Sequence, residues 1–127
     1  MIYLLDTHAL IWFLEEDAQL PEITRVQIET TPTVFLSTAS LWEIAIKANI
    51  GKLTLSYPFR TIESILTDLG IVQLPITFAD LEVYLTLPLH HRDPFDRLLV
   101  AQAIEHSLTL ISRDTRMDAY KVQRFWR

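Results

Sequence analysis

The amino-acid sequence predicts an α/β fold in three layers, α/β/α, with a central, mostly parallel sheet. Short apolar runs alternate along the chain with longer segments of helical period, as in consecutive βα units. Half of the 127 residues are hydrophobic, which is enough to bury a core without disulfides or a structural metal. This length lies within the usual size range of a single domain, so we expect one domain over residues 1–127.

The first half of the chain predicts two strands and three helices. Residues 2–5 are an apolar run that stops at Asp6, as a buried strand does where it enters a loop. Apolar residues then recur at three and four positions, which predicts a helix that ends before Pro21. The next expected elements are a helix over residues 22–30, a strand over 34–36 and a helix from residue 41 to a stop at Gly51.

The second half continues the alternation. An amphipathic segment closed by Gly70 predicts a helix over residues 61–69. The elements expected after it are a strand over 71–74, a helix over 78–87, a polar interruption at 90–94, a helix over 95–106 and strands over 108–111 and 121–126. Strands that alternate with helices favour a parallel sheet covered on both faces.

Four acids are candidate catalytic and metal-binding residues: Asp6, Glu43, Asp96 and Asp114. Asp6 and Asp114 each come just after a predicted strand, whereas Glu43 and Asp96 each fall in the first turn of a predicted helix. In open parallel sheets the working groups gather beyond the carboxyl ends of the strands. We therefore expect the four carboxylates to meet at one edge of the sheet.

Each acid also has a purely structural interpretation, which is favoured when that acid is considered alone. Asp6 is a candidate helix cap, and Ser40 and Glu43 are candidates for a capping box. Asp93 is a candidate cap for the next helix, in whose first turn the charge of Asp96 would interact favourably with the helix dipole. Asp114 fits an ordinary turn. The functional interpretation depends on all four acids sharing one edge.

Crowded carboxylates repel one another, so such a cluster is stable only if cations neutralise it or some pKa values rise. Oxygen ligands select a hard divalent ion, here Mg²⁺, for which Mn²⁺ can substitute. Such an ion lowers the pKa of a bound water and neutralises charge on a scissile phosphate. The acids therefore indicate metal-dependent hydrolysis of phosphodiester bonds.

Three neighbours of the acids are expected to support them. Thr7 and Ser112 can orient a carboxylate or a metal-bound water, and Lys47 is placed to form an ion pair with Glu43 one helical turn away. The histidines have structural interpretations: His8 begins a helix, and the pair at 90 and 91 has no third partner at metal spacing.

The charge distribution excludes a passive nucleic-acid coat, because the net charge is −5 and such proteins need a basic surface. Residues 92–127 nevertheless carry seven Lys or Arg against five acids. Four arginines lie close in sequence to Asp96 and Asp114 and are candidate RNA contacts: Arg92, Arg97, Arg113 and Arg116. Their alternative interpretation is ordinary solvated surface charge.

The sequence favours a cytoplasmic protein with no membrane contact. It has no cysteine, which fits a reducing compartment. An acid interrupts the apolar amino-terminal run at residue 6, unlike a secretory signal. No apolar run approaches the roughly 20 residues needed to span a bilayer.

Four segments in order resemble the motifs of the PIN-domain ribonucleases, and most of all the VapC toxins of bacterial toxin-antitoxin pairs. The segments are LLDT at 4–7, SLWEIAIK at 40–47 followed by GKL at 51–53, HRDPFDRLLVAQA at 91–103, and LISRD at 110–114. The resemblance implies a PIN-like domain in which Asp6, Glu43 and Asp96 occupy the three principal acidic positions. Asp114 then matches the more variable fourth position.

The resemblance also implies a function and partners. The expected activity is that of an endoribonuclease in which a metal-activated water cleaves RNA to leave a 5′-phosphate and a 3′-hydroxyl. The expected partners are the RNA substrate, a cognate antitoxin protein and a second copy of the chain in a homodimer.

Two other functions remain open from the sequence. A phosphatase that forms an aspartyl-phosphate on Asp6 would use a second Asp two residues later, where this chain has His8. A non-catalytic interaction domain of the same fold would bind a partner without needing the four acids.

Overall fold

The computed structural model describes all residues 1–127 and contains one five-stranded sheet in the order β3-β2-β1-β4-β5. Every neighbouring pair of strands is parallel, so the expected mostly parallel sheet is parallel throughout. The strands are β1 (Tyr3–Leu5), β2 (Val34–Ser37), β3 (Ile71–Leu74), β4 (Thr109–Ile111) and β5 (Gln123–Phe125).

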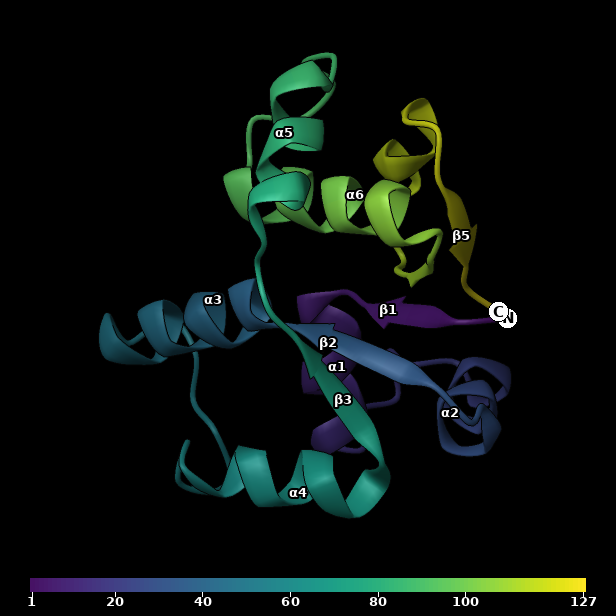
Figure 1. Cartoon of the computed structure of the whole chain (residues 1–127). Coiled ribbons are helices and arrows are strands. Elements are labelled where there is room, and N and C mark those ends of the chain that lie inside the picture. The colour runs from purple at the N-terminus through teal and green to yellow at the C-terminus, as the bar shows by residue number, and fades with distance from the viewer.

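Helices cover both faces of the sheet. Figure 1 shows α5 and α6 on one side, with α1, α2 and α4 on the other. The helices are α1 (Thr7–Leu14), α2 (Glu22–Thr30), α3 (Thr38–Asn49), α4 (Thr61–Leu69), α5 (Phe78–Thr86) and α6 (Pro94–His106), with a 3-10 turn, η1 (Thr115–Ala119). The turn η1 was not predicted from the sequence. None of the helices combines the length and apolar character that crossing a membrane would require.

The alternation of side chains along β1 divides the core into two clusters. Leu4 points to the face covered by α6 and packs in a cluster with Leu99 and Leu110. Tyr3 and Leu5 point to the opposite face, in the larger cluster that includes residues of α1, α2 and α4. Both faces of the sheet are therefore buried, as a parallel sheet requires.

The start of α3 differs from the sequence prediction. Ser37, the last residue of β2, caps the helix by accepting a hydrogen bond from the backbone N–H of Ala39. The predicted capping box of Ser40 and Glu43 is therefore wrong, and Glu43 lies in the second turn. The strand runs directly into the helix, so the serine at the junction is the one free to cap it.

The order of the strands creates a crevice between β1 and β4. From β1 the chain proceeds to β2 on one side, whereas β4 is added on the other side. Leu5 at the end of β1 is in register with Ile111 at the end of β4, and the backbone N–H of Asp6 donates to the carbonyl of Ile111 over 3.0 Å. The loops beyond these two strand ends diverge, which places a binding crevice there.

The core predicts a clear response to truncation. Leu110→Ala should reduce the free energy of unfolding by about 2 to 5 kcal/mol, because the side chain is fully buried and its removal leaves a cavity. Urea denaturation measures this loss. Leu89 is 72% exposed, so Leu89→Ala should change stability by no more than about 0.5 kcal/mol. Equal losses in the two variants would contradict the assignment of the core.

Candidate functional site

A polar hollow of about 340 Å³ lies over the carboxyl ends of β1 and β4, at the crevice described above. All four predicted acids line it, together with four basic or histidine side chains, one tryptophan and a fifth acid. The lining residues are Asp6, His8, Trp12, Glu43, Lys47, Asp93, Asp96, Arg113, Asp114 and Arg116. Residues up to 110 positions apart in sequence thus share one cavity.

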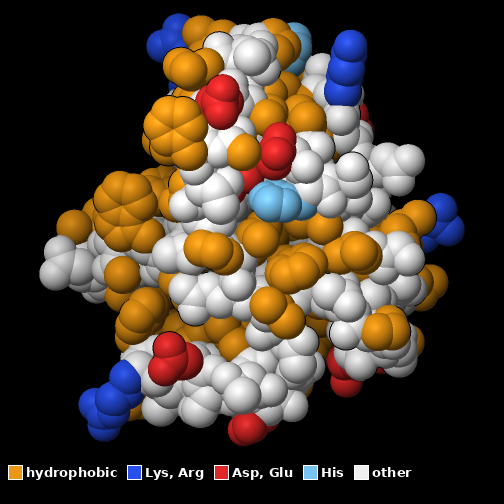
Figure 2. Space-filling model, in the orientation of Figure 1, with side chains coloured by type: hydrophobic (Ala, Val, Ile, Leu, Met, Phe, Trp, Pro, Cys, Tyr) orange, Lys and Arg blue, Asp and Glu red, His pale blue; other side chains and the backbone are white.

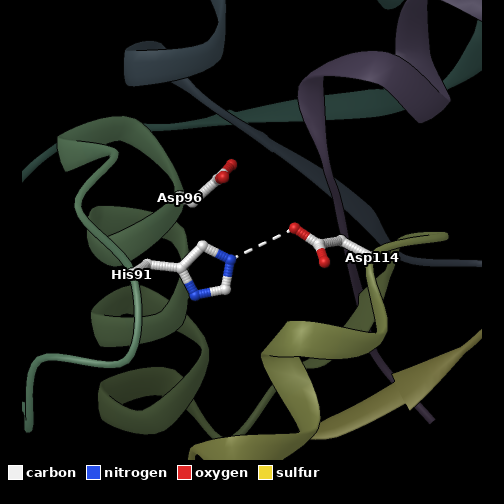
Figure 3. A group of neighbouring side chains, drawn as sticks. All are labelled: His91, Asp96 and Asp114. Atoms are coloured by element: carbon white, nitrogen blue, oxygen red, sulfur yellow. Dashed lines mark hydrogen bonds and ion pairs between the residues drawn. The ribbon is translucent and has the colours of Figure 1, made fainter.

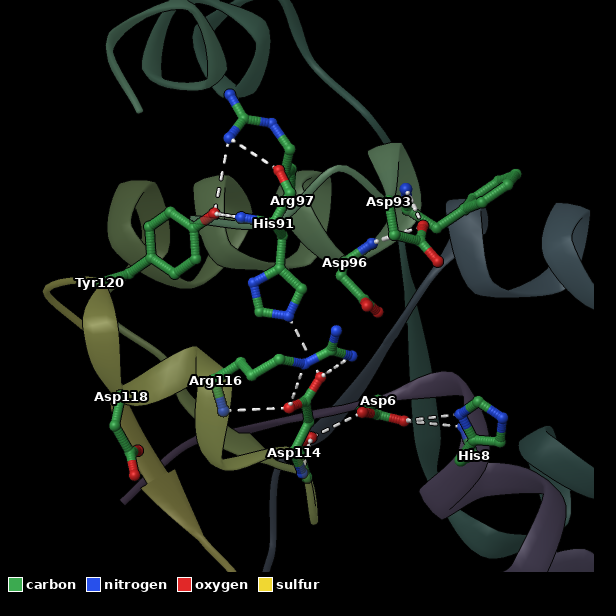
Figure 4. Close-up of polar contacts among 12 residues, drawn as sticks. Asp6, His8, His91, Asp93, Asp96, Arg97, Asp114, Arg116, Asp118 and Tyr120 are labelled. Atoms are coloured by element: carbon green, nitrogen blue, oxygen red, sulfur yellow. Dashed lines mark hydrogen bonds and ion pairs between the residues drawn. The ribbon is translucent and has the colours of Figure 1, made fainter. Parts of the chain in front are cut away.

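Asp6 is both a helix cap and a member of the cavity. Its Oδ1 accepts hydrogen bonds from the backbone N–H groups of His8 at 2.7 Å and Ala9 at 3.4 Å, at the start of α1 (Figure 4). Its Oδ2 accepts from Ser112 Oγ at 2.6 Å. Because both oxygens are held, the carboxylate has one orientation.

Ser112 joins the two loops that form the crevice. Besides donating to Asp6, its hydroxyl accepts a hydrogen bond from the backbone N–H of Asp114 at 3.1 Å. The expected contact of Ser112 with an acid is therefore present. Thr7 makes a different contact: its hydroxyl donates to Ser40 Oγ at 2.9 Å and ties the start of α1 to α3 instead of touching a carboxylate.

Glu43 reaches the cavity from α3 and is 5% exposed. Its Oε2 lies 2.9 Å from Lys47 Nζ, which is the helical ion pair expected from the spacing. Lys47 therefore neutralises the charge of one acid within the cluster.

Asp96 reaches the cavity from the first turn of α6. The helix is capped by Asp93, whose carboxylate accepts from the backbone N–H groups of Phe95 and Asp96, and Pro94 is its first residue, as predicted. Burial, the largest cause, and the negative charges of Asp93, Asp6, Glu43 and Asp114 together raise the pKa of Asp96 to about 7. Asp96 has no cationic partner, so it carries the uncompensated charge of the cluster.

Asp114 differs from Asp96 in its surroundings. It caps η1, and its carboxylate receives a two-pronged contact from Arg116, with Nε at 3.0 Å and Nη2 at 2.9 Å. Partial burial opposes ionisation, but the hydrogen bonds from Arg116 and His91 and the Arg116 charge outweigh it and hold the pKa of Asp114 well below its usual range. The fourth acid is thus already neutralised by a side chain of the protein.

His91 is a member of this cluster that the sequence did not reveal. Its Nε2 lies 3.1 Å from Asp114 Oδ2, and one ligand atom from each of His91, Asp96 and Asp114 falls within 4.8 Å of the others (Figure 3). The prediction that the pair at 90 and 91 has no third partner at metal spacing is wrong for His91. The partners are distant in sequence, and the one local signal was a polar interruption directly before the helix that carries Asp96.

The four predicted arginines occupy different environments. Arg113 and Arg116 are exposed at the edge of the cavity, and the Arg113 guanidinium lies over the ring of Trp12, 4.5 Å from its centroid. Arg92 is exposed but does not line the cavity. Arg97 is 8% exposed and donates to the backbone carbonyl of Pro88 at 2.9 Å. Its prediction as an RNA contact is therefore wrong, because the guanidinium is turned into the protein.

The sequence also matches a family model, that of the PIN domain, over residues 3–123. The chain belongs to the PIN domain family. Among curated proteins this PIN domain is 27% identical over 119 residues to Ribonuclease VapC22 of Mycobacterium tuberculosis, covering 93% of this chain and 91% of that protein. The family resemblance expected from the four motifs is thereby confirmed.

Solved structures show the same fold. VapBC2 from Rickettsia felis, bound to a DNA fragment from its promoter, superposes with a TM-score of 0.75 at 14% identity over the full length of both chains. FitAcB from Neisseria gonorrhoeae gives a TM-score of 0.69 at 22% identity and covers 98% of this chain and 96% of its own. These likenesses confirm the three-layer α/β/α PIN-like architecture.

The donor set of this PIN domain suits a hard divalent cation. The oxygens of Asp6, Glu43, Asp96 and Asp114 face one hollow, and hard cations such as Mg²⁺ and Mn²⁺ prefer oxygen ligands. The raised pKa of Asp96 is consistent with this, because it reflects burial and the negative charges of the neighbouring acids. A cation beside Asp96 would offset that negative charge.

The raised pKa predicts an unusual dependence of stability on pH in the metal-free protein. Folding raises the pKa of Asp96 from 3.8 to about 7, so the native state binds this proton more tightly than the unfolded state. The resulting destabilisation is complete above pH 7 and disappears as the pH falls towards 4. In EDTA, the melting temperature should therefore rise as the pH is lowered from 8 to 5.

Asp96→Asn should remove this contribution and stabilise the metal-free protein at pH 8 by about 1 to 2 kcal/mol. That value is smaller than the pKa shift alone implies, because water screens a partly exposed carboxyl. Asp68→Asn is the matched control, since Asp68 is exposed on α4, away from the cavity. Parallel pH profiles for wild type and Asp96→Asn would contradict the assignment of the excess charge to Asp96.

Proposed function

We propose that this PIN domain is a metal-dependent endoribonuclease and the toxin of a toxin-antitoxin pair. The observation that carries the proposal is the gathering of four carboxylates in one hollow, with Asp96 left without a cationic partner. The similarity to Ribonuclease VapC22 supports RNA as the substrate. The rim of basic side chains around the acids suits a polyanion despite the negative net charge of the chain.

In this proposal Asp6 and Asp96 are the principal ligands of Mg²⁺, for which Mn²⁺ can substitute, and Glu43 and Asp114 complete the site directly or through water. The bound ion would supply an activated water and neutralise charge on the scissile phosphate. Ser112 and the amide groups at the start of α1 hold Asp6 in one orientation, so the first ligand is placed before the ion arrives.

The basic rim would position the RNA. Arg113 is fixed at the lip of the cavity by Trp12 and by a hydrogen bond from Nη1 to Gln19 Oε1 at 3.2 Å. Arg116 is 70% exposed and can exchange its contact with Asp114 for a phosphate once a metal ion neutralises that acid. Arg113 and Arg116 are therefore the proposed phosphate contacts, whereas Arg92 lies beyond the lining of the hollow.

We also propose an antitoxin protein and a second copy of the chain as partners. The similar structures from Rickettsia felis and Neisseria gonorrhoeae are VapBC2 and FitAcB, which supports an antitoxin.

Apolar side chains gather over α3 and α5 on one flank of the molecule (Figure 2), and the exposed ones include Trp42, Phe78, Leu81 and Leu85. Light scattering of the 14.8 kDa chain and binding of the adjacent gene's product test these assemblies.

The purified protein, free of antitoxin, should cleave RNA in Mg²⁺ or Mn²⁺ and stop on chelation. Asp6→Asn and Asp96→Asn should each reduce cleavage by roughly 100-fold or more, because the metal contributes several kcal/mol to the transition state. Gel analysis of a labelled transcript measures the rate, and circular dichroism checks the fold. Asp68→Asn should cleave like the wild type.

The products should carry 5′-phosphate and 3′-hydroxyl ends, which end-specific ligation can distinguish. Binding of RNA without cleavage of any transcript, under the same ionic conditions, would replace the nuclease proposal with a non-catalytic interaction domain. Trapping of a phosphorylated protein after incubation with a phosphodonor would instead favour a phosphatase that uses Asp6 as the nucleophile.

Arg113→Gln should weaken RNA binding with little change in kcat. Removal of one phosphate contact should raise KM several-fold and flatten the dependence of log K on log salt by about 0.7, as expected for single-stranded nucleic acid. Filter binding to a chelator-treated protein over a range of salt concentrations measures the slope. Arg60→Gln, at the start of α4, is the control; an equal effect there would contradict a specific rim contact.

A further inference from the structure

The buried histidine of the cavity wall makes a directional contact with the fourth acid. His91 lies in the loop between α5 and α6, and its side chain is 1% exposed. The ring turns Nε2 towards Asp114 Oδ2 at 3.1 Å, while Nδ1 faces away from both Asp96 and Asp114 (Figure 3). The contact is thus made by one nitrogen only.

The loop that carries His91 is held from the side opposite the cavity. The backbone N–H of His91 donates to Tyr120 Oη at 2.9 Å, and the two rings stack with centroids 5.8 Å apart (Figure 4). Arg97 donates to the carbonyls of Leu87, Pro88 and His91 at 3.5, 2.9 and 3.5 Å. A buried arginine and a buried tyrosine therefore fix the position from which the imidazole reaches Asp114.

The hydrogen-bond partners of the ring indicate which nitrogen carries the hydrogen. A carboxylate oxygen faces Nε2, so Nε2 must donate. Nδ1 is buried and has no partner. A hydrogen on Nδ1 would be a buried donor without an acceptor, which costs more than leaving a lone pair unused. The ring is therefore assigned to the tautomer with hydrogen on Nε2.

The same environment argues against His91 as a metal ligand. A histidine that binds metal through one nitrogen nearly always donates a hydrogen bond from the other nitrogen to a carboxylate, carbonyl or water. At His91 no protein group accepts a hydrogen bond from Nδ1. His91 therefore lies next to the proposed metal ligands Asp96 and Asp114 but is not itself a ligand.

His91 and Arg116 both contact Oδ2 of Asp114, but they differ in burial and in where they are attached. Arg116 is 70% exposed and belongs to the same turn as Asp114, so its contact does not tie Asp114 to any other element. His91 is buried, and its loop is held both by Tyr120 at the end of η1 and by Arg97 of α6. Of these two residues, only His91 connects the carboxylate of Asp114 to α6, the helix that carries Asp96.

We propose that His91 is a positioning residue, which through its Nε2–H holds Asp114 at the distance from Asp96 that a shared divalent cation requires. This inference rests on the proposed metal-dependent nuclease function and adds a residue to it. Without His91, the carboxylate of Asp114 would follow Arg116 towards solvent, and the cation would lose its fourth acidic partner.

Two substitutions of His91 separate hydrogen bonding from packing. His91→Phe keeps a flat ring beneath Tyr120 but has no donor, whereas His91→Gln presents an amide Nε2 close to the position of the imidazole Nε2. The same changes at the exposed neighbour His90, which packs edge-on against Tyr120, are the controls. Mn²⁺ binding followed by electron paramagnetic resonance, without RNA, reports on the site independently of catalysis.

His91→Phe should weaken Mn²⁺ binding by about 10- to 100-fold, the usual effect of losing a partner of a metal ligand. Cleavage kcat at fixed Mn²⁺ should fall with it, while KM for RNA stays the same. His91→Gln should restore both values to within a few-fold, and both His90 variants should resemble the wild type. Wild-type affinity and kcat in His91→Phe would overturn the proposal, as would failure of His91→Gln to improve on His91→Phe.

A third measurement keeps this inference distinct from the nuclease proposal. Long-range ¹H–¹⁵N spectra of the metal-free wild type should show hydrogen on Nε2 of His91, and hydrogen on Nδ1 alone would overturn the assigned contact whether or not RNA is cleaved. Coupling of bound Mn²⁺ to a ¹⁵N-labelled His91 would show direct ligation and would also overturn it. Absence of cleavage in the wild type, with the Mn²⁺ results as expected, would refute the nuclease function and leave the positioning role intact.

Discussion

Mutual repulsion among carboxylates at the ends of β1 and β4 is the constraint on which the rest of this site depends. The parallel sheet and its strand order bring acids from four separate segments into one hollow. The protein can fold around them only because most of their charge is offset by neighbouring groups. The arrangement of those neighbours decides where charge remains, and hence where a cation can bind.

The offsetting groups are distributed unevenly over the four acids. Asp6 is stabilised by backbone N–H groups and a serine hydroxyl, Glu43 by Lys47, and Asp114 by Arg116 and His91. Asp96 has none of these, and burial together with the charges of the neighbouring acids raises its pKa. The same neighbouring residues therefore stabilise the fold and leave Asp96 as the one acid without an offsetting group. Such an acid is expected in a site that binds a metal ion.

The sequence was informative about elements because their signals are local. Helical period, turn residues and the cap at Asp93 act within a few positions, and the strands and helices were found close to their observed ends. Two local predictions failed because of the tertiary setting. Ser37 took the capping role predicted for Ser40, since β2 continues directly into α3, and Arg97 turned inwards to bind the carbonyls of a neighbouring loop.

The sequence by itself determined the α/β class, the family and the four acids, because the strand ends and the ordered motifs around the acids are legible in the linear chain. Only the tertiary structure decided how their charge is shared and that His91 belongs beside Asp114, 23 positions away. The physical reason is that repulsion, burial and hydrogen bonding depend on distances in space. Those distances arise from the order of strands in the sheet, which no local pattern specifies.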